Sequence, residues 1–226
     1  MNLGVKLAAV VLIGVTPAFA DSLPVTGYVT ATWSGISGSG ESGNGTNVWT
    51  YDSGTQDSST LTFAPSYSLS GQFSGSTPLR LQLGQLQDYN AGNINHQQSP
   101  TASLTVNVVF TSPSGTVPLQ FTLGVNEQLS GGQDSVVQLA NADGVANSFV
   151  DSNGHRYNVT LEGFYGDSNG TGSPITSLTT DARSTSTAYL FADITSNPEP
   201  VSFVLMGTVG LLVAIAFRRK SKSSAV

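Results

Sequence analysis

Apolar residues recur at every second position in five stretches of this chain. A period of two places the apolar side chains of a strand on one face, whereas an amphipathic helix repeats about every 3.6 residues. No stretch between residues 21 and 197 keeps a helical period. We therefore expect an all-β body, an antiparallel β-sandwich with the jelly roll as a candidate topology. The five expected strand faces are Leu79, Leu81 and Leu83; Leu104, Val106, Val108 and Phe110; Leu119, Phe121, Leu123 and Val125; Tyr157, Val159 and Leu161; and Ala188, Leu190, Ala192 and Ile194.

Turn-forming residues separate these stretches. Ser, Pro, Asn and Gly cluster at 112–115, 130–132 and 151–154, as they do where a chain reverses direction. Segments 35–45 and 166–173 are rich in Gly and Ser and predict long loops, and we expect a further loop at 184–187 before the last strand.

The first twenty residues have the pattern of a secretory signal peptide. Lys6 precedes an apolar run at 7–15, and the small residues Ala18 and Ala20 precede Asp21. A positive flank, a short apolar helix and small side chains before the cleavage point are what the export machinery requires. The pattern predicts cleavage by signal peptidase before Asp21, whereas a buried N-terminal helix would need a polar face that residues 7–15 lack.

A second apolar run, at 201–217, predicts a single transmembrane helix. Its 17 residues contain no charged side chain. They would reach about 25 Å as a helix, and long flanking side chains can make up the rest of a core roughly 30 Å thick. Four cations follow: Arg218, Arg219, Lys220 and Lys222. By the positive-inside rule they stay cytoplasmic, so that residues 218–226 form a basic tail and 21–195 an extracytoplasmic domain.

The short linker 196–200 contains Pro198, Glu199 and Pro200 just before the apolar run. Proline cannot continue a helix, so an extended and accessible peptide is expected at the membrane boundary. This motif, the span and the basic cluster together resemble the PEP-CTERM sorting signal. The resemblance implies recognition and processing by an exosortase in a Gram-negative bacterium. It also implies an inner-membrane-anchored precursor that ends at the cell surface or in the extracellular matrix, in association with exopolysaccharide or biofilm.

The body carries a second resemblance. The run at 83–94 followed by the stretch 103–110, and the run at 154–164, resemble signatures of the choice-of-anchor K domain family over about residues 27 to 195. Where that family would have a Trp-Gly pair, this chain has Trp49-Thr50. The resemblance implies no catalytic residues.

Composition excludes several functions. Thirteen carboxylates and three arginines lie between residues 21 and 197, a net charge of −10, which argues against nucleic acid as a partner. The chain has no cysteine and two histidines, so a disulfide framework is impossible and a histidine metal site is not expected. Asp88, Glu127 and Glu162 are the carboxylates to weigh for sugar hydrolysis. We read them as solubilising residues and expect a non-enzymatic protein without a cofactor.

Two binding hypotheses stay open for the body. Trp33 and Trp49, with Tyr51 and Tyr89, would stack on sugar rings if they are exposed, although aromatic residues of a sandwich are more often core. Asp-Ser-Asn-Gly occurs twice, and its oxygens would suit calcium, although the same residues also form hairpin turns. The alternative function is therefore a carbohydrate-binding or calcium-dependent adhesive module. The calcium candidates are Asp151, Asn153, Asp167 and Asn169.

Overall fold

The structure, a computed structural model, describes residues 23–37, 41–53, 58–73, 77–92, 100–127 and 134–197. The expected signal peptide, the Pro198-Glu199-Pro200 motif, the apolar run 201–217 and the basic tail lie outside these residues. Within them, no helix has the length and apolar character needed to cross a membrane. The elements are β1 (Pro24–Ser37), β2 (Val48–Ser53), β3 (Ser58–Pro65), β4 (Leu69–Gln72), β5 (Leu79–Asn90), β6 (Thr101–Ser112), β7 (Ser114–Glu127), β8 (Ser135–Gln138), the 3₁₀ turn η1 (Ala140–Ala142), β9 (Ala146–Val150), β10 (Arg156–Tyr165), β11 (Ser177–Thr180) and β12 (Ser184–Asn197).

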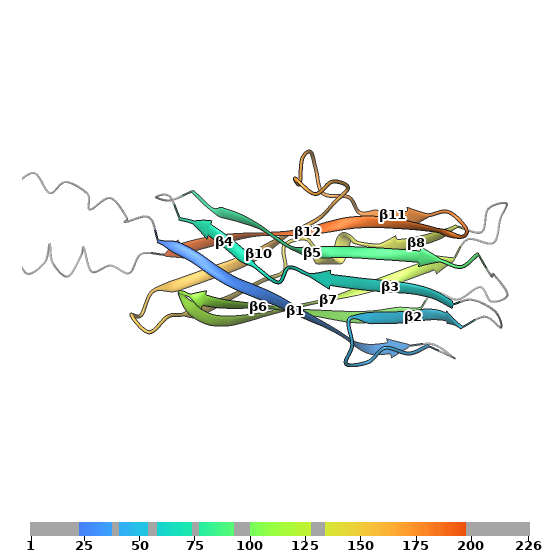
Figure 1. The fold of residues 1–226 in the computed structure, drawn as a ribbon, viewed down its shortest axis with the longest axis horizontal. Helices are drawn as coiled ribbons and strands as arrows, with labels where there is room; N and C mark the ends of the chain where they lie inside the picture. The colour runs from blue at the N-terminus through green and yellow to red at the C-terminus, as the bar shows by residue number, and fades with distance from the viewer. Residues whose placement is uncertain are drawn as a thin grey trace, which may run out of the picture.

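The strands form two antiparallel sheets, as the period of two predicts (Figure 1). The first sheet has the order β11-β8-β7-β6-β1-β4 and the second the order β2-β3-β5-β12-β10-β9. A jelly roll is built from about eight strands, whereas the described part of this chain has six strands in each sheet.

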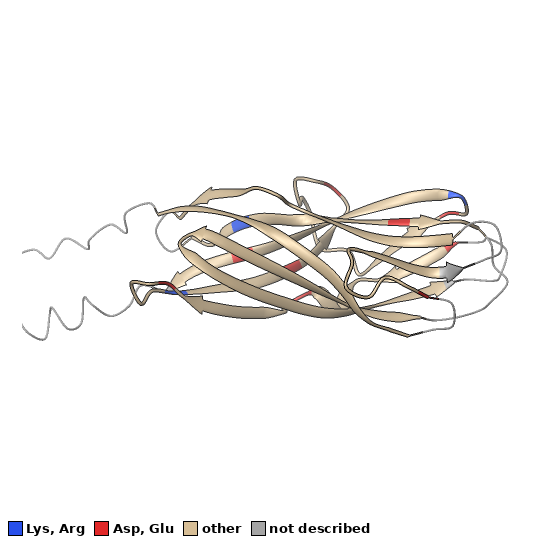
Figure 2. Cartoon of the chain, turned by 60° about the horizontal axis from the view of Figure 1, so that its bottom comes forward, with Lys and Arg blue, Asp and Glu red and all other residues tan. Residues whose placement is uncertain are grey.

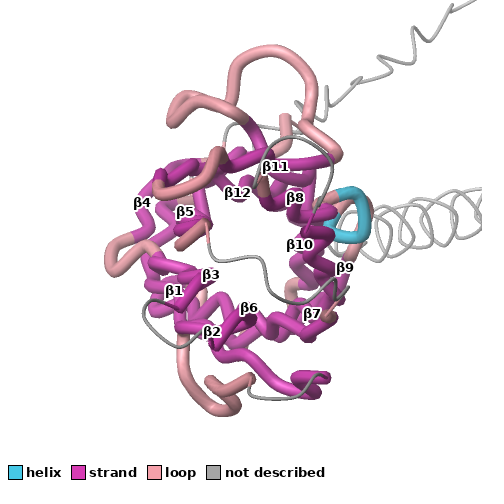
Figure 3. The backbone as a smooth tube through the Cα atoms, turned by 90° about the vertical axis from the view of Figure 1, so that its right-hand side faces the viewer, coloured by secondary structure: helices cyan, strands magenta, loops and turns pink. Residues whose placement is uncertain are grey.

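The flanks of the two sheets are joined by hydrogen bonds. The amide of Val29 in β1 donates to Ser66 O at 2.8 Å, beside β3 of the second sheet. On the opposite flank, Asn147 Nδ2 of β9 donates to Pro118 O of β7 at 3.0 Å. Seen along the long axis, the strands therefore surround the interior as a flattened ring (Figure 3). Such contacts cover sheet edges that would otherwise pair with other chains.

The core lies between the sheets and is built from the alternating positions. All five expected strand faces point inward, with Leu79 partly buried and the other members buried. The predicted loop at 184–187 is wrong, because β12 begins at Ser184 and pairs with the end of β5, with Ser184 opposite Asn90. Segment 35–45 also differs from the prediction, since β1 continues to Ser37. Segment 166–173 forms a loop, as expected.

Both ends of the described body lie at the same end of the sandwich. β1 begins and β12 finishes there (Figure 1). Leu23 lines a pocket together with Tyr157, and Tyr157 is opposite Ser196 in the β10–β12 pair. The chain therefore enters and leaves the sandwich at one pole, which we call the entry pole.

Candidate functional site

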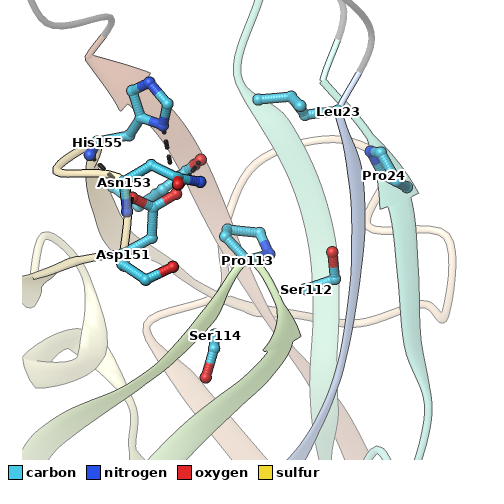
Figure 4. Close-up of a pocket in the computed structure, with 10 residues that line it drawn as sticks. Leu23, Pro24, Ser112, Pro113, Ser114, Asp151, Asn153 and His155 are labelled. Atoms are coloured by element: carbon cyan, nitrogen blue, oxygen red, sulfur yellow. Dashed lines mark hydrogen bonds and ion pairs between the residues drawn. The ribbon is translucent and has the colours of Figure 1, made fainter.

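A pocket of about 180 Å³ opens at the entry pole. The β6–β7 turn forms one wall, the β9–β10 turn another, and the start of β1 a third (Figure 4). Leu23, Pro24 and Pro113 supply apolar surface, and the polar lining residues are Ser112, Ser114, Asp151, Ser152, Asn153, His155 and Tyr157.

The Asp151 carboxylate organises the β9–β10 turn. Oδ1 accepts the backbone N–H of Asn153 at 2.8 Å and that of His155 at 2.9 Å. Oδ2 lies 3.3 Å from His155 Nδ1 and accepts the Tyr157 hydroxyl at 3.4 Å. Gly154 closes the turn with a φ of 88°, a conformation that favours glycine. Burial raises the pKa of Asp151, but the backbone and His155 hydrogen bonds outweigh it, and the pKa is lowered overall.

The pocket brings serine, histidine and aspartate together, but not in the order that nucleophilic catalysis needs. In a Ser–His–Asp relay, one imidazole nitrogen faces the carboxylate and the other faces the serine hydroxyl. Figure 4 shows His155 Nδ1 directed at Asp151 and the opposite side of the ring directed away from Ser112 and Ser114. The pair is therefore not arranged to activate either serine.

The second Asp-Ser-Asn-Gly segment repeats the first turn's chemistry elsewhere in the fold. Asp167 Oδ1 accepts the backbone N–H of Asn169 at 2.8 Å, and Oδ2 accepts the Thr171 hydroxyl at 2.7 Å. The Thr171 hydrogen bond is the largest cause of the lowered pKa of Asp167. Both predicted calcium carboxylates thus bind donors of their own turns. No group of three or more His, Cys, Asp or Glu side chains that could hold a metal ion occurs in the part of the chain that the structure describes.

Arg80 holds the loop after β10 against the outer face of the second sheet. Its guanidinium lies 4.5 Å from the ring centre of Tyr165 and 4.6 Å from that of Phe191. It also forms an ion pair with Glu162 and donates from Nη1 to Gly170 O at 2.7 Å. Glu162, weighed as a catalytic carboxylate, is therefore held by a cation on the sheet surface.

Asp88 lies between the two sheets and is fully buried. Its Oδ1 accepts the Tyr51 hydroxyl at 2.8 Å, and its Oδ2 accepts the Ser135 hydroxyl at 2.6 Å. Burial raises the pKa of Asp88, although hydrogen bonds to Ser135 and Tyr51 oppose the shift. Asp88 thus joins β5 and β2 of one sheet to β8 of the other. The Glu127 side chain, the third carboxylate weighed for hydrolysis, lies outside the described part.

The predicted sugar-stacking residues Trp33 and Trp49 are both fully buried. Their ring centres lie 5.5 Å apart in the core, and Trp49 Nε1 donates to Glu41 Oε2 at 3.2 Å. Because the condition of exposure is not met, neither ring can stack on a sugar. Tyr51 is buried as well, whereas Tyr89 is 37% exposed.

The sequence contained a signal for these burials. Val29, Ala31 and Trp33 follow the same period of two as the predicted strands, which places the Trp33 ring inside. Arg80 had no such signal, because its partners come from β10, β12 and a loop far along the chain.

The fold and these sites define the chain as an all-β protein of two antiparallel, curled sheets. No model of a known protein family matches it, and a search of curated proteins finds no match either.

Proposed function

We propose that this chain is an exported, non-enzymatic surface or matrix protein, sorted by its C-terminal tail and processed by an exosortase. The tail combines Pro198-Glu199-Pro200 with an apolar run and a basic cluster, and the N-terminus has the pattern of a signal peptide. In this proposal the protein is first an inner-membrane-anchored precursor of a Gram-negative bacterium. It later reaches the cell surface or matrix, in association with exopolysaccharide.

The single pole of entry and exit is the structural observation that supports this proposal. β12 continues to Asn197, next to the Pro198-Glu199-Pro200 motif, and β1 begins at the same pole. A sandwich tethered there presents its long strands and opposite pole away from the membrane. Cleavage of the signal peptide and cleavage of the C-terminal tail would then both occur at this pole, and both sheets would stay intact.

Mass spectrometry of the mature protein from cells that produce it tests the sorting proposal. We expect the C-terminal peptide to end near Pro198-Glu199-Pro200, and an intact Val226 on the mature protein would contradict processing. Replacing Pro198 and Pro200 by alanine is expected to leave the tail uncut. Pro174→Ala, a proline exchange in a loop of the body, serves as the matched control and should be processed normally.

The second candidate function is a carbohydrate-binding or calcium-dependent adhesive module. Of the residues on which the sequence based the carbohydrate form, Trp33, Trp49 and Tyr51 are buried and Tyr89 is exposed. The calcium candidates Asp151 and Asp167 accept hydrogen bonds from their own turns. The outer surface of the first sheet offers a different site for carbohydrate binding, described below.

A further inference from the structure

The outer face of β1, β6 and β7 is mostly polar, with Val109 and Pro118 among its apolar members, and none of the outward side chains that the structure describes on it is charged. Outward side chains alternate with the core residues of each strand and lie in register across the three strands. Thr32 pairs with Thr105, for example, and Thr105 pairs with Gln120. We call the polar central part of this surface the hydroxyl face, and it consists of Thr30, Thr32, Ser34, Ser103, Thr105, Asn107, Gln120 and Thr122.

The missing charge is notable in an acidic protein. The segment 21–197 has a net charge of −10, yet no member of the hydroxyl face is charged. Figure 2 shows how sparse the charged segments are along the strands. A charged polymer would gain no ion pair on this face and would meet the negative field of the rest of the body if it were anionic.

Two exposed tyrosines border the hydroxyl face. Tyr28 precedes Thr30 on the same side of β1 and is 41% exposed, and Tyr67 is 83% exposed. The backbone of Tyr67 lies beside that of Tyr28, because Val29 N–H donates to Ser66 O at 2.8 Å and Gly27 pairs with Leu69. Tyrosine combines a flat apolar ring with a polar tip, so it suits a partner that has both C–H surfaces and hydroxyl groups.

We propose that Tyr28, Tyr67 and the hydroxyl face bind a neutral polysaccharide chain. Side chains two apart on a strand are about 6.6 Å apart, so that Tyr28 to Ser34 spans roughly 20 Å, room for several consecutive sugar units. Ser, Thr, Asn and Gln offer both donors and acceptors, as sugar hydroxyls require. A second copy of the chain is a poorer fit, because a polar sheet pressed on itself would bury many hydroxyl groups with little apolar area. This inference gives the second candidate function a site, and it does not depend on the sorting tail.

Affinity electrophoresis of the full chain in a non-ionic detergent tests the site. Gels would contain dextran, a galactomannan or soluble starch, with alginate as an anionic counterpart. We expect retardation by at least one neutral polymer and none by alginate. Tyr28→Ala and Tyr67→Ala should each weaken the apparent affinity about tenfold, the order of one lost aromatic contact. Thr30→Arg, which puts bulk and charge on the face, should weaken it as well.

Tyr189→Ala is the matched control, since Tyr189 is a partly exposed tyrosine that lies on the outer face of the other sheet, between the buried Ala188 and Leu190. It should bind as the unaltered chain does, and circular dichroism should show all four variants folded. Retardation by no neutral polymer, or equal loss in Tyr189→Ala, would overturn the proposal. So would sedimentation showing a dimer that Thr30→Arg dissociates, because the face would then be a self-association surface. None of these outcomes bears on the sorting proposal, which is tested separately by mass spectrometry of the C-terminal peptide.

Discussion

At the scale of single residues, Asp88 is where charge and burial conflict most directly. Its carboxylate has no exposed surface and is held by the Tyr51 and Ser135 hydroxyls. Removal from water penalises the charged form more than these hydrogen bonds favour it, so the pKa in the folded state is raised. Asp88 therefore contributes stability that is fully present below its unfolded pKa and is lost as pH rises through the folded pKa.

Replacing Asp88 by asparagine should remove this pH dependence. We expect the unaltered chain to lose stability relative to Asp88→Asn as pH rises from 4 towards 8, by at most about 1.4 kcal/mol per pH unit. Urea unfolding across this range measures the difference. Ser135→Ala keeps the carboxylate but deletes a donor to its charged form, so the loss should begin at the same pH and extend to higher pH. Parallel curves for the unaltered chain and Asp88→Asn would contradict the argument.

At the scale of elements, the β9–β10 turn depends on Asp151. We expect Asp151→Ala to lower the free energy of unfolding by about 1 kcal/mol, because two turn amides lose their acceptor. Ser152→Ala in the same turn is the control and should change little.

Since the pKa of Asp151 is lowered, its stabilisation is present above the unfolded pKa and is lost as pH falls through the folded pKa. Hydrogen exchange at the His155 amide reports the turn directly, and unchanged protection in Asp151→Ala would refute its role.

The inward faces of the five strands could be predicted from the sequence, but the inward residues beyond a bulge could not. In β5 the inward residues are Leu81 and Leu83, and then Leu86, Asp88 and Asn90, so the alternation changes phase. The register against β12 shifts there, between Leu190 and Phe191. A bulge of this kind depends on the partner strand and leaves little trace in a single sequence. For this reason the prediction that Asp88 is a solubilising residue is wrong: the change of phase turns its side chain into the core.

Candidate sites were harder to predict than strands because their members meet through pairing of distant segments. Arg80 reaches Gly170, and Tyr28 meets the segment before β4, only once the sheets have formed. The tryptophans show the converse case, since their residue type suggested a sugar site while the period of β1 already placed Trp33 inside. Pattern outweighs residue type where the two disagree.

At the scale of the whole molecule, both ends of the described body lie at the entry pole, so they can be joined and new ends opened elsewhere. Leu23 and Ser196 both lie near Tyr157, Leu23 through the pocket and Ser196 through the strand pair. A Gly/Ser linker of about six residues spans roughly 13 Å on average, which is enough to join such neighbours. We therefore expect a circular permutant to fold when Asn197 is linked to Leu23 and the chain is opened in the loop near Gly172.

The opening site matters because loops tolerate new ends and strands do not. Gly172 lies in the loop 166–176 and a Cβ there would meet open space, whereas opening within β12 would cut a strand that pairs with both β5 and β10. The permutant opened near Gly172 should keep the all-β circular dichroism and melt within a few degrees of the unaltered chain. A permutant opened at Ala188 should not fold. If both failed equally, the two ends would not be neighbours, and a body tethered at one pole would lose its structural support.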